Sequence, residues 1–249
     1  MDIELLEKKA KQIRLDSLDL SIKYENGHLA SAFSIVELLT VLYYDKMDLA
    51  QDEFILSKGH GCLSLYAVLK DKGYDPEIAG HPDYAPESGI VCTSGSLGHG
   101  LPLGCGKALA NKLQGNNGKV YVIVGDGECQ EGSVWETLNI ARRFNVNNLV
   151  TIVDHNKLQA LDSVKAVLDE DNLRAKFEAF GAKVIEVDGH NILQIKEGLN
   201  KVDDSMPYVF IAHTVKSKGV SFMENIPGWH VRMMNDEEQR IARKELENA

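Results

Sequence analysis

Short apolar runs that alternate with helical stretches are the feature of this sequence that most restricts its fold. Runs rich in Val and Ile, separated by helices, are typical of parallel strands that helices cover on both faces. The candidate strands are residues 54–56, 120–124, 149–153, 184–187 and 209–212. The helical stretches between them are about 60–71, 98–113, 132–143, 170–179 and 191–201. The sequence therefore predicts an α/β fold, a parallel sheet with helices on both faces, whose ligands bind at the carboxyl ends of the strands.

Helical patterns also precede and follow the alternating part. Leu and Ile recur at helical spacing over residues 3–23. A second helix is predicted over 34–45, where Ser34 and Glu37 form a capping-box pattern. Residues 235–248 are either a charged helix or a frayed tail. We expect a single domain over 1–249, with its N-terminal helix within residues 1–26 and a charged tail over 235–249.

Composition limits the classes of function. The chain has 249 residues, long enough to bury a sizeable core, and its 27 Lys and Arg against 37 Asp and Glu give a net charge of −10. An acidic chain is a poor candidate for binding nucleic acid or an anionic membrane. Without an apolar run of roughly 18 residues or a signal-peptide pattern, we expect a cytoplasmic globular protein.

The four cysteines give no sign of a metal cluster or a disulfide framework. They are scattered, and the sequence has neither a C-x-x-C pair nor an H-E-x-x-H motif. We expect reduced thiols, buried or near a site. The cysteines are Cys62, Cys92, Cys105 and Cys129.

The strongest chemical motif follows the strand at 120–124. Gly125-Asp126-Gly127 presents a carboxylate where the backbone can approach a phosphate closely, and Asn156 follows 28 residues later, after the next strand. Both side chains are hard oxygen donors, suited to a Mg²⁺ ion that holds a diphosphate. The alternatives are a simple turn and a dinucleotide fingerprint, whose third glycine is replaced here by Gln130.

The motif resembles the thiamine-diphosphate motif, and neighbouring segments narrow the resemblance to transketolase. The segments 125–132 and 154–157 are similar to the transketolase version, and further matches occur in family order over about residues 27–230. They are Gly27-His28, Ser57-Lys58-Gly59-His60-Gly61, Gly80-His81-Pro82, 93–100, 186–190, 218–225 and Gly228-Trp229-His230.

The resemblance implies thiamine diphosphate as cofactor, with Mg²⁺ (or Ca²⁺ or Mn²⁺) as its metal. Asp126, Asn156 and the backbone carbonyl of Leu158 match the metal ligands. The backbone N–H of Gly127 matches a donor to the diphosphate. Glu131 matches a glutamate at a dimer interface that links two cofactor sites.

Four histidines match catalytic positions of the family. His60 and His230 match histidines that contact the diphosphate and face the reacting carbon, while His28 and His81 match histidines that line the substrate channel. Histidine suits the proton transfers of ketose cleavage near neutral pH. The other four histidines are expected to be structural. They are His99, His155, His190 and His213.

Two segments depart from the family pattern. Gly95 and Leu97 match backbone positions that hold the cofactor, but Ser96 stands between them in place of proline, and His99 in place of glutamine. His99 either bonds to the cofactor ring or caps the following helix. After His230 the sequence reads Val231-Arg232-Met233-Met234 instead of a glycine and an alanine–proline pair. Arg232 either contacts an unusual acceptor or the partner chain, or forms a surface salt bridge. These departures put the sugar specificity in doubt.

The resemblance also implies a second chain. The family's aminopyrimidine-binding domain, with its activating glutamate and the arginines that bind substrate phosphate, has no counterpart in this sequence. We therefore expect the N-terminal subunit of a split transketolase, which transfers a two-carbon ketol group between sugar phosphates. It is expected to be inactive without a C-terminal, pyrimidine-binding partner subunit, with which it would form a heterotetramer.

Three other functions are alternatives to this one. The first is a transketolase-like subunit of a specialised pathway for modified or surface sugars. Another is a 2-oxo acid dehydrogenase component, which shares the metal motif but not the segments around His28, His81 and Gly95. The last is a non-catalytic scaffolding half, which the intact Asp126 and Asn156 argue against.

Overall fold

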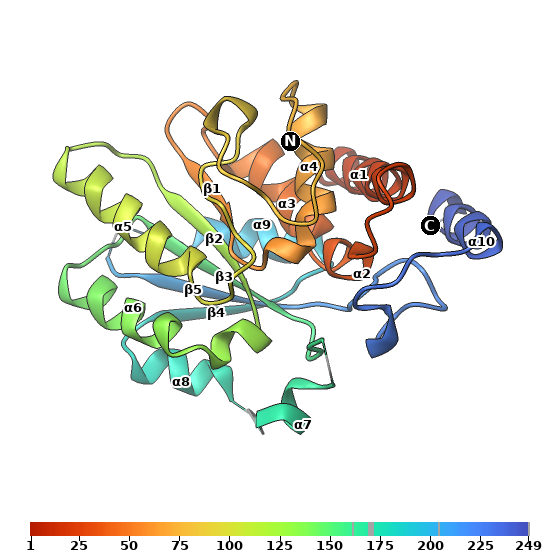
Figure 1. The fold of residues 1–249 in the computed structure, drawn as a ribbon. Helices are drawn as coiled ribbons and strands as arrows, with labels where there is room; N and C mark the ends of the chain where they lie inside the picture. Colours follow the sequence, from red (N-terminus) through yellow and green to blue (C-terminus); the bar gives the residue numbers. More distant parts are fainter. Residues whose placement is uncertain (161, 169–171, 204, 249) are drawn as a thin grey trace.

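A five-stranded sheet forms the centre of the computed structural model, which describes residues 1–160, 162–168, 172–203 and 205–248. The strand order is β1-β2-β3-β5-β4, and every neighbouring pair is parallel (Figure 1). The parallel sheet predicted from the apolar runs is confirmed. The strands are β1 Glu53–Leu56, β2 Val120–Gly125, β3 Leu149–His155, β4 Lys183–Asp188 and β5 Tyr208–His213.

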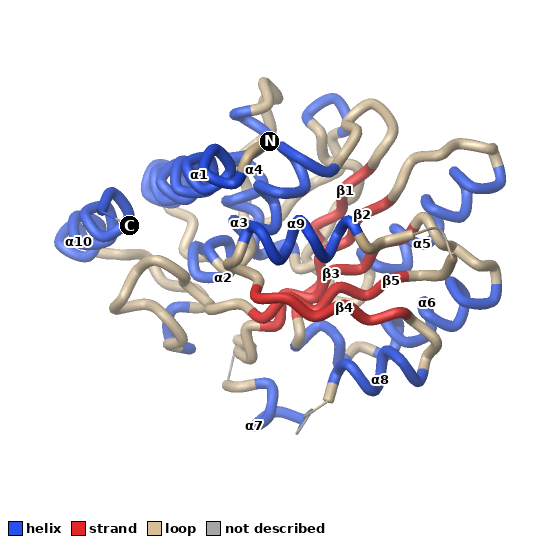
Figure 2. Tube along the Cα trace, turned by 180° about the vertical axis from the view of Figure 1, so that it is seen from behind, coloured by secondary structure: helices blue, strands red, loops and turns tan. Residues whose placement is uncertain are grey.

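Helices cover both faces of this sheet. Helices α5, α6 and α8 lie along one face, and α1, α3, α4 and α9 lie on the other, as Figures 1 and 2 show from opposite sides. The α-helices are α1 Ile3–Lys23, α2 Leu29–Phe33, α3 Val36–Val41, α4 Cys62–Asp71, α5 Gly100–Leu113, α6 Gly132–Arg143, α7 Val164–Leu168, α8 Leu173–Ala179, α9 Ile192–Asn200 and α10 Asp236–Asn248. The 3₁₀ turns are Gly59–Gly61, Pro86–Ser88, Gly127–Gln130 and Pro227–Trp229, and Leu42–Lys46 is a π-helical turn.

The sheet divides the interior into two cores because successive strand residues point to opposite faces. On β2, Tyr121 and Ile123 join the core beneath α1, α3, α4 and α9. Val122 and Val124 join the core beneath α5, α6 and α8. Burial on both faces explains why the strands read as continuous apolar runs.

The single helix predicted over 34–45 is wrong. The chain instead forms α2, a break, α3 and the π-helical turn. Ser34 caps no helix, since its hydroxyl donates to the Ser31 carbonyl (2.9 Å) and to Asp154 Oδ2 (2.7 Å). Glu37 bonds to Arg14 and His190 in the interior. Both polar side chains are therefore used for tertiary contacts rather than for a capping box.

Other helix boundaries differ in smaller ways. α5 begins at Gly100 rather than 98, because Gly98 has a left-handed φ of 77° and His99 is the N-cap. α8 begins at Leu173, while positions 170 and 171 of the predicted stretch lie outside the described residues. The short helices α2 and α7 were not predicted.

The charged stretch at 235–248 is a helix. α10 packs beside α1, with Ala242 and Leu246 buried in the core (Figure 1). The thiol prediction is confirmed, because the cysteines are free and buried. No helix in the described part of the chain combines the length and the apolar character that crossing a membrane would require.

Candidate active site

The loops after β2 and β3 place Asp126 and Asn156 side by side. Gly125 pairs with Asp154 in the register of these strands, so both loops leave the sheet at the same edge. Asp126 Oδ1 accepts from the Gly127 N–H (2.8 Å), and Oδ2 accepts from the N–H of the residue after Asn156. Asn156 Oδ1 accepts from the Leu158 N–H at 3.0 Å. Each loop thus fixes a side-chain oxygen at the carboxyl edge.

The Asp126 carboxylate lies in an environment that favours a cation. It is 1% exposed, and its burial and the neighbouring Asp154 charge raise its pKa to about 7. A divalent ion at this carboxylate would relieve both effects. The oxygens of Asp126, Asn156 and Leu158 are of the kind that Mg²⁺ binds. Among the described residues no group of three or more His, Cys, Asp or Glu side chains could hold a metal, so phosphate and water would have to complete the coordination.

Asp154 anchors a buried polar network directly behind this site. Its Oδ2 accepts from Lys58 Nζ at 2.5 Å, from Ser34 and from Asn156 Nδ2 (2.9 Å), and Oδ1 accepts from Thr214. Asp154 is 0% and Lys58 1% exposed. Burial alone would raise the pKa of Asp154, but the Lys58 charge and these hydrogen bonds hold it below its ordinary value. The network fixes the Asn156 amide, so its oxygen remains on the side of Leu158.

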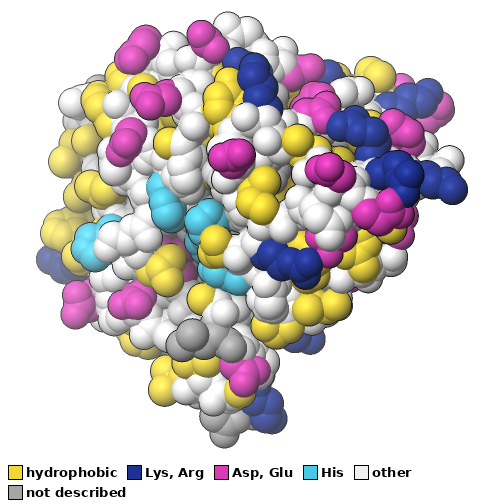
Figure 3. Space-filling view, turned by 45° about the vertical axis from the view of Figure 1, so that its right-hand side comes forward, with side chains coloured by type: hydrophobic (Ala, Val, Ile, Leu, Met, Phe, Trp, Pro, Cys, Tyr) yellow, Lys and Arg dark blue, Asp and Glu magenta, His cyan; other side chains and the backbone are white. Residues whose placement is uncertain are grey.

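Four histidines converge over the same loops. The ring of His28 lies 5.6 Å from that of His81, 6.2 Å from that of His60 and 6.1 Å from that of His230. His60 and His230 are 5.2 Å apart. Figure 3 shows histidine side chains gathered in a hollow of one face. The four residues predicted to be catalytic are therefore brought together from widely separated segments of the chain.

Three of these rings are held neutral. Burial and then His81 lower the pKa of His28, and burial and then Lys58 lower that of His60 well below its usual range. Burial and then Lys216 lower the pKa of His230 to about 4. A neutral imidazole offers one donor and one acceptor, which suits hydrogen bonding to sugar hydroxyls.

A cavity of about 270 Å³ joins the polar loops to the histidines. It includes all the predicted site residues except Glu131, which lies outside it and is exposed. A larger hollow of about 480 Å³ lies around Tyr43, Glu53 and Lys107, away from the polar loops, and none of the predicted site residues lines it. The predicted residues at the smaller cavity are His28, His60, His81, Gly95, Leu97, Asp126, Gly127, Asn156, Leu158 and His230.

Glu128 ties the 95–98 segment to the end of β2. Its buried Oε1 accepts from the Gly98 N–H at 2.8 Å and from the Ser57 hydroxyl, and its Oε2 accepts from the Gly125 N–H at 3.1 Å. The Leu97 carbonyl lies 3.0 Å from His99 Nδ1. His99 precedes α5 without a side-chain cap, so the capping alternative for this residue is wrong.

Sequence reasoning did not assign the two buried lysines of the site. Lys58 belongs to a recognised segment, but its burial becomes visible only with the fold. Lys216 is 1% exposed, and its Nζ lies 2.9 Å from His230 Nδ1 and donates to the Gln159 carbonyl at 3.3 Å. Burial and then Lys58 lower the pKa of Lys216 to about 8. The only sequence signal for Lys216 is its place just after β5.

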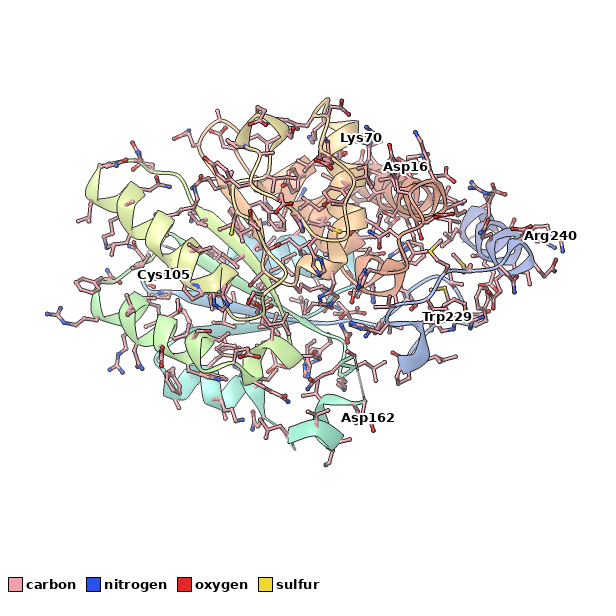
Figure 4. The ribbon with its side chains drawn as sticks, in the orientation of Figure 1. Asp16, Lys70, Cys105, Asp162, Trp229 and Arg240 are labelled. Carbon is pink, nitrogen blue, oxygen red and sulfur yellow. The ribbon has the colours of Figure 1, made fainter. Side chains whose placement is uncertain are left out.

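Arg232 forms a surface salt bridge, one of its two expected alternatives. Its guanidinium donates to Glu238 at 2.6 Å and lies 3.9 Å from the centre of the Trp229 ring. Trp229 stands on the segment that leads from the sheet toward α10, as Figure 4 shows. The Arg232 N–H also donates to the Gly27 carbonyl at 3.1 Å, which links the chain after His230 to the chain before His28.

The chain matches the family described as "Transketolase, thiamine diphosphate binding domain" over residues 6–248. It belongs to the transketolase family. A transketolase is a transferase, and this domain binds thiamine diphosphate, so the cofactor inferred from the motif is confirmed at the level of the family.

Relatives of similar length are transketolase subunits. The chain is 38% identical to an apulose-4-phosphate transketolase subunit of Actinobacillus succinogenes, covering 98% of this transketolase and 96% of that protein. It is 32% identical to "6-deoxy-6-sulfo-D-fructose transketolase subunit SqwG" of a Clostridium species, covering 97% and 96%. Human transketolase is 31% identical over 92% of this chain and 40% of its own length.

Solved structures agree with the fold. Transketolase from Campylobacter jejuni superposes with a TM-score of 0.88 at 25% identity, over 99% of this transketolase chain and 43% of that chain. Transketolase from Leishmania mexicana gives a TM-score of 0.85 at 22% identity, over 98% and 44%. The chain therefore has the α/β diphosphate-binding fold of transketolases.

Proposed function

We propose that this chain is the diphosphate-binding subunit of a split transketolase that moves a two-carbon ketol group between sugar phosphates. The observation that carries the proposal is the single cavity in which Asp126 and Asn156 meet four histidines. Each of these groups alone has a structural explanation. Together they provide a cation site and proton carriers around one space.

Asp126, Asn156 and the Leu158 carbonyl would hold the divalent metal, with Mg²⁺ as the first candidate and Ca²⁺ or Mn²⁺ as alternatives. The fit is supported by the buried Asp126 carboxylate and by Gly127, where an added Cβ would come within 2.7 Å of the Gln159 side chain. A glycine at that position leaves room for a diphosphate to approach the backbone. The Gly127 N–H would then turn toward the diphosphate, and Lys216 would add positive charge beside it.

The remaining cofactor contacts follow the same cavity. His60 and His230 would bond to the diphosphate side, and the backbone of Gly95 and Leu97 would hold the ring. Gly95 has a φ of 130°, and a Cβ there would lie 2.9 Å from His81, so only glycine fits. Thiamine diphosphate, when bound, supplies the nucleophilic carbon and the electron sink that cleavage of a carbon–carbon bond requires.

The chain's own contribution to the chemistry is positioning and proton transfer. His28 and His81 would bond to donor hydroxyls, and His60 and His230 would hold or move protons near the reacting carbon. Neutral rings can accept a hydroxyl proton and return it without a change of pH. The buried Lys58–Asp154 pair keeps the loop of Asn156 fixed while this happens.

A partner chain would complete the site. Relatives that match this chain over almost their whole length are themselves named as subunits, which supports a second chain. Exposed apolar side chains near the cavity, such as Leu97, Leu103 and Val231, and the exposed Glu131 would lie in the contact. We infer a heterotetramer of two copies of each chain. The single-domain boundary and the cytoplasmic location also remain predictions.

Two relatives favour a specialised sugar pathway over the central one. Their names specify apulose-4-phosphate and 6-deoxy-6-sulfo-D-fructose as the sugars on which those transketolases act. The atypical segment after His230 is consistent with an unusual sugar, because it borders the histidines. We therefore propose a modified or branched ketose phosphate as the donor.

Co-expression with the candidate partner tests this function. The purified complex is expected to transfer a ketol group in a thiamine-diphosphate-dependent assay, with apulose-4-phosphate, 6-deoxy-6-sulfo-D-fructose and fructose-6-phosphate as alternative donors. The chain alone is expected to be inactive. Ordinary ketol transfer by the isolated chain would refute the need for a partner, and full activity of Asp126→Ala would refute the metal assignment.

A further inference from the structure

His190 lies outside the cavity, yet both of its ring nitrogens are bonded in the interior. Its Nε2 accepts from the Val215 N–H at 2.8 Å, and its Nδ1 lies 3.0 Å from Glu37 Oε2. A backbone N–H can only donate, so Nε2 must carry the lone pair and Nδ1 the proton. The structure therefore fixes one tautomer of His190, with Nδ1–H donating to Glu37.

Glu37 is held as a buried anion. It is 7% exposed, and its Oε1 accepts from the Arg14 guanidinium at 2.6 Å. Burial alone would raise the pKa of Glu37, but Arg14 and His190 bring it down to about 2. A charged carboxylate with a fixed partner on each oxygen is a rigid acceptor for the imidazole.

Val215 is the residue before Lys216, so the bond to His190 acts on the chain that carries the buried lysine. The bend continues at Ser217, whose φ of 66° is left-handed and whose N–H donates to the Ala30 carbonyl at 3.0 Å. The Lys216 carbonyl accepts from the Asn225 N–H at 3.1 Å. A non-glycine residue keeps a left-handed conformation only where its surroundings hold it there.

Lys216 in turn determines the state of His230. An ammonium group can only donate, so the contact of 2.9 Å from Lys216 Nζ requires a lone pair on His230 Nδ1. His230 then carries its proton on Nε2. His230 lines the cavity and faces His28, His60 and Lys216.

We propose that Glu37 and His190 are a positioning pair that acts through Val215 and Lys216 to set the orientation and tautomer of His230. The pair touches neither the cavity nor any group that would react. This inference rests on the proposed function for its effect on activity, but its structural part does not.

Nitrogen-15 NMR of the histidine-labelled full chain tests the structural part directly. The expected spectrum shows His190 protonated on Nδ1 and His230 protonated on Nε2 at neutral pH. In His190→Phe, which removes both hydrogen bonds and keeps a ring, the His230 signal is expected to change to a mixture of tautomers. A wild-type His190 protonated on Nε2, or an unchanged His230 signal in the folded variant, would overturn the proposal.

A double-mutant cycle tests the route through Lys216 in the complex with the partner. His190→Phe is expected to lower kcat roughly 10- to 100-fold, as a misplaced catalytic group does. In a Lys216→Met background the same change is expected to alter kcat less than about twofold, because the lysine that transmits it is absent. Full, multiplicative losses would overturn the proposal.

The matched control is His213→Phe. His213 is also paired with a carboxylate, Glu186 at 2.8 Å, but lies outside the cavity and is half-exposed, so kcat is expected to be unchanged. If the wild-type complex shows no ketol transfer, the proposed function fails, while the tautomers still decide the positioning pair. If His190→Phe does not fold, the wild-type spectrum decides it.

Discussion

Replacing Lys58 with methionine removes the cation from the most deeply buried carboxylate of the site. Asp154 is 0% exposed and loses its 2.5 Å ion pair, but it keeps hydrogen bonds from Ser34, Thr214 and Asn156. Breaking a buried pair from one side costs about 3–5 kcal/mol. The remaining donors, and protonation of Asp154, place the expected loss in the free energy of unfolding near the lower limit, at about 3 kcal/mol.

Urea unfolding followed by circular dichroism at pH 7 measures this loss. The matched control is Lys107→Met, which removes a partly exposed 2.7 Å pair with Glu53 and is expected to cost about 1 kcal/mol or less. The pKa of Asp154 is lowered in the folded chain, so its stabilisation is present above its unfolded pKa and is lost as the pH falls through the folded one. The difference between wild type and Lys58→Met is therefore expected to shrink on acidification. A loss at pH 7 no larger than that of Lys107→Met would refute the reasoning.

Three further predictions concern single residues. Glu37, with a pKa of about 2 against an ordinary 4.5, is expected to contribute about 3 kcal/mol that is present above pH 4.5 and lost between 4.5 and 2; acid titration of Glu37→Gln should show a correspondingly flatter stability profile. Gly98→Ala places a Cβ 2.5 Å from the Ser133 hydroxyl at a φ of 77°, so thermal unfolding should report a loss of at least about 1–2 kcal/mol, and wild-type stability would contradict the expected clash. Arg232→Ala loses a half-exposed pair with Glu238, so stability should fall by about 1 kcal/mol or less and the KM for the ketose donor should stay the same; a large rise in KM would instead support the substrate contact.

The sequence predicted those parts of the fold and site that depend on local pattern. Buried strands read as Val- and Ile-rich runs because helices cover both sheet faces, and all five were located in this way. Asp126 and Asn156 were found because parallel strands bring their carboxyl ends to one edge. The four histidines were assigned through resemblance to a family, and their convergence needed the three-dimensional structure.

The missed features depend on contacts between distant segments. Ser34 and Glu37 fit a capping box, but Asp154 lies 120 positions from Ser34 and His190 lies 153 from Glu37. No local pattern reveals such partners. Lys216 looks like any lysine in a polar loop until the fold buries it against His230. Polar side chains are poorly placed by periodicity because their partners, not their spacing, decide where they point.

Binding of thiamine diphosphate to the complex of this chain with its partner tests the central claim most directly. Calorimetry with Mg²⁺ and with EDTA, on wild type and on Asp126→Ala, measures whether the carboxyl-edge oxygens hold the metal that holds the cofactor. We predict binding that requires Mg²⁺ and weakens roughly 100-fold, or about 2.8 kcal/mol, in Asp126→Ala, with His213→Phe unchanged. Equal affinity in EDTA, or in Asp126→Ala, would contradict the account.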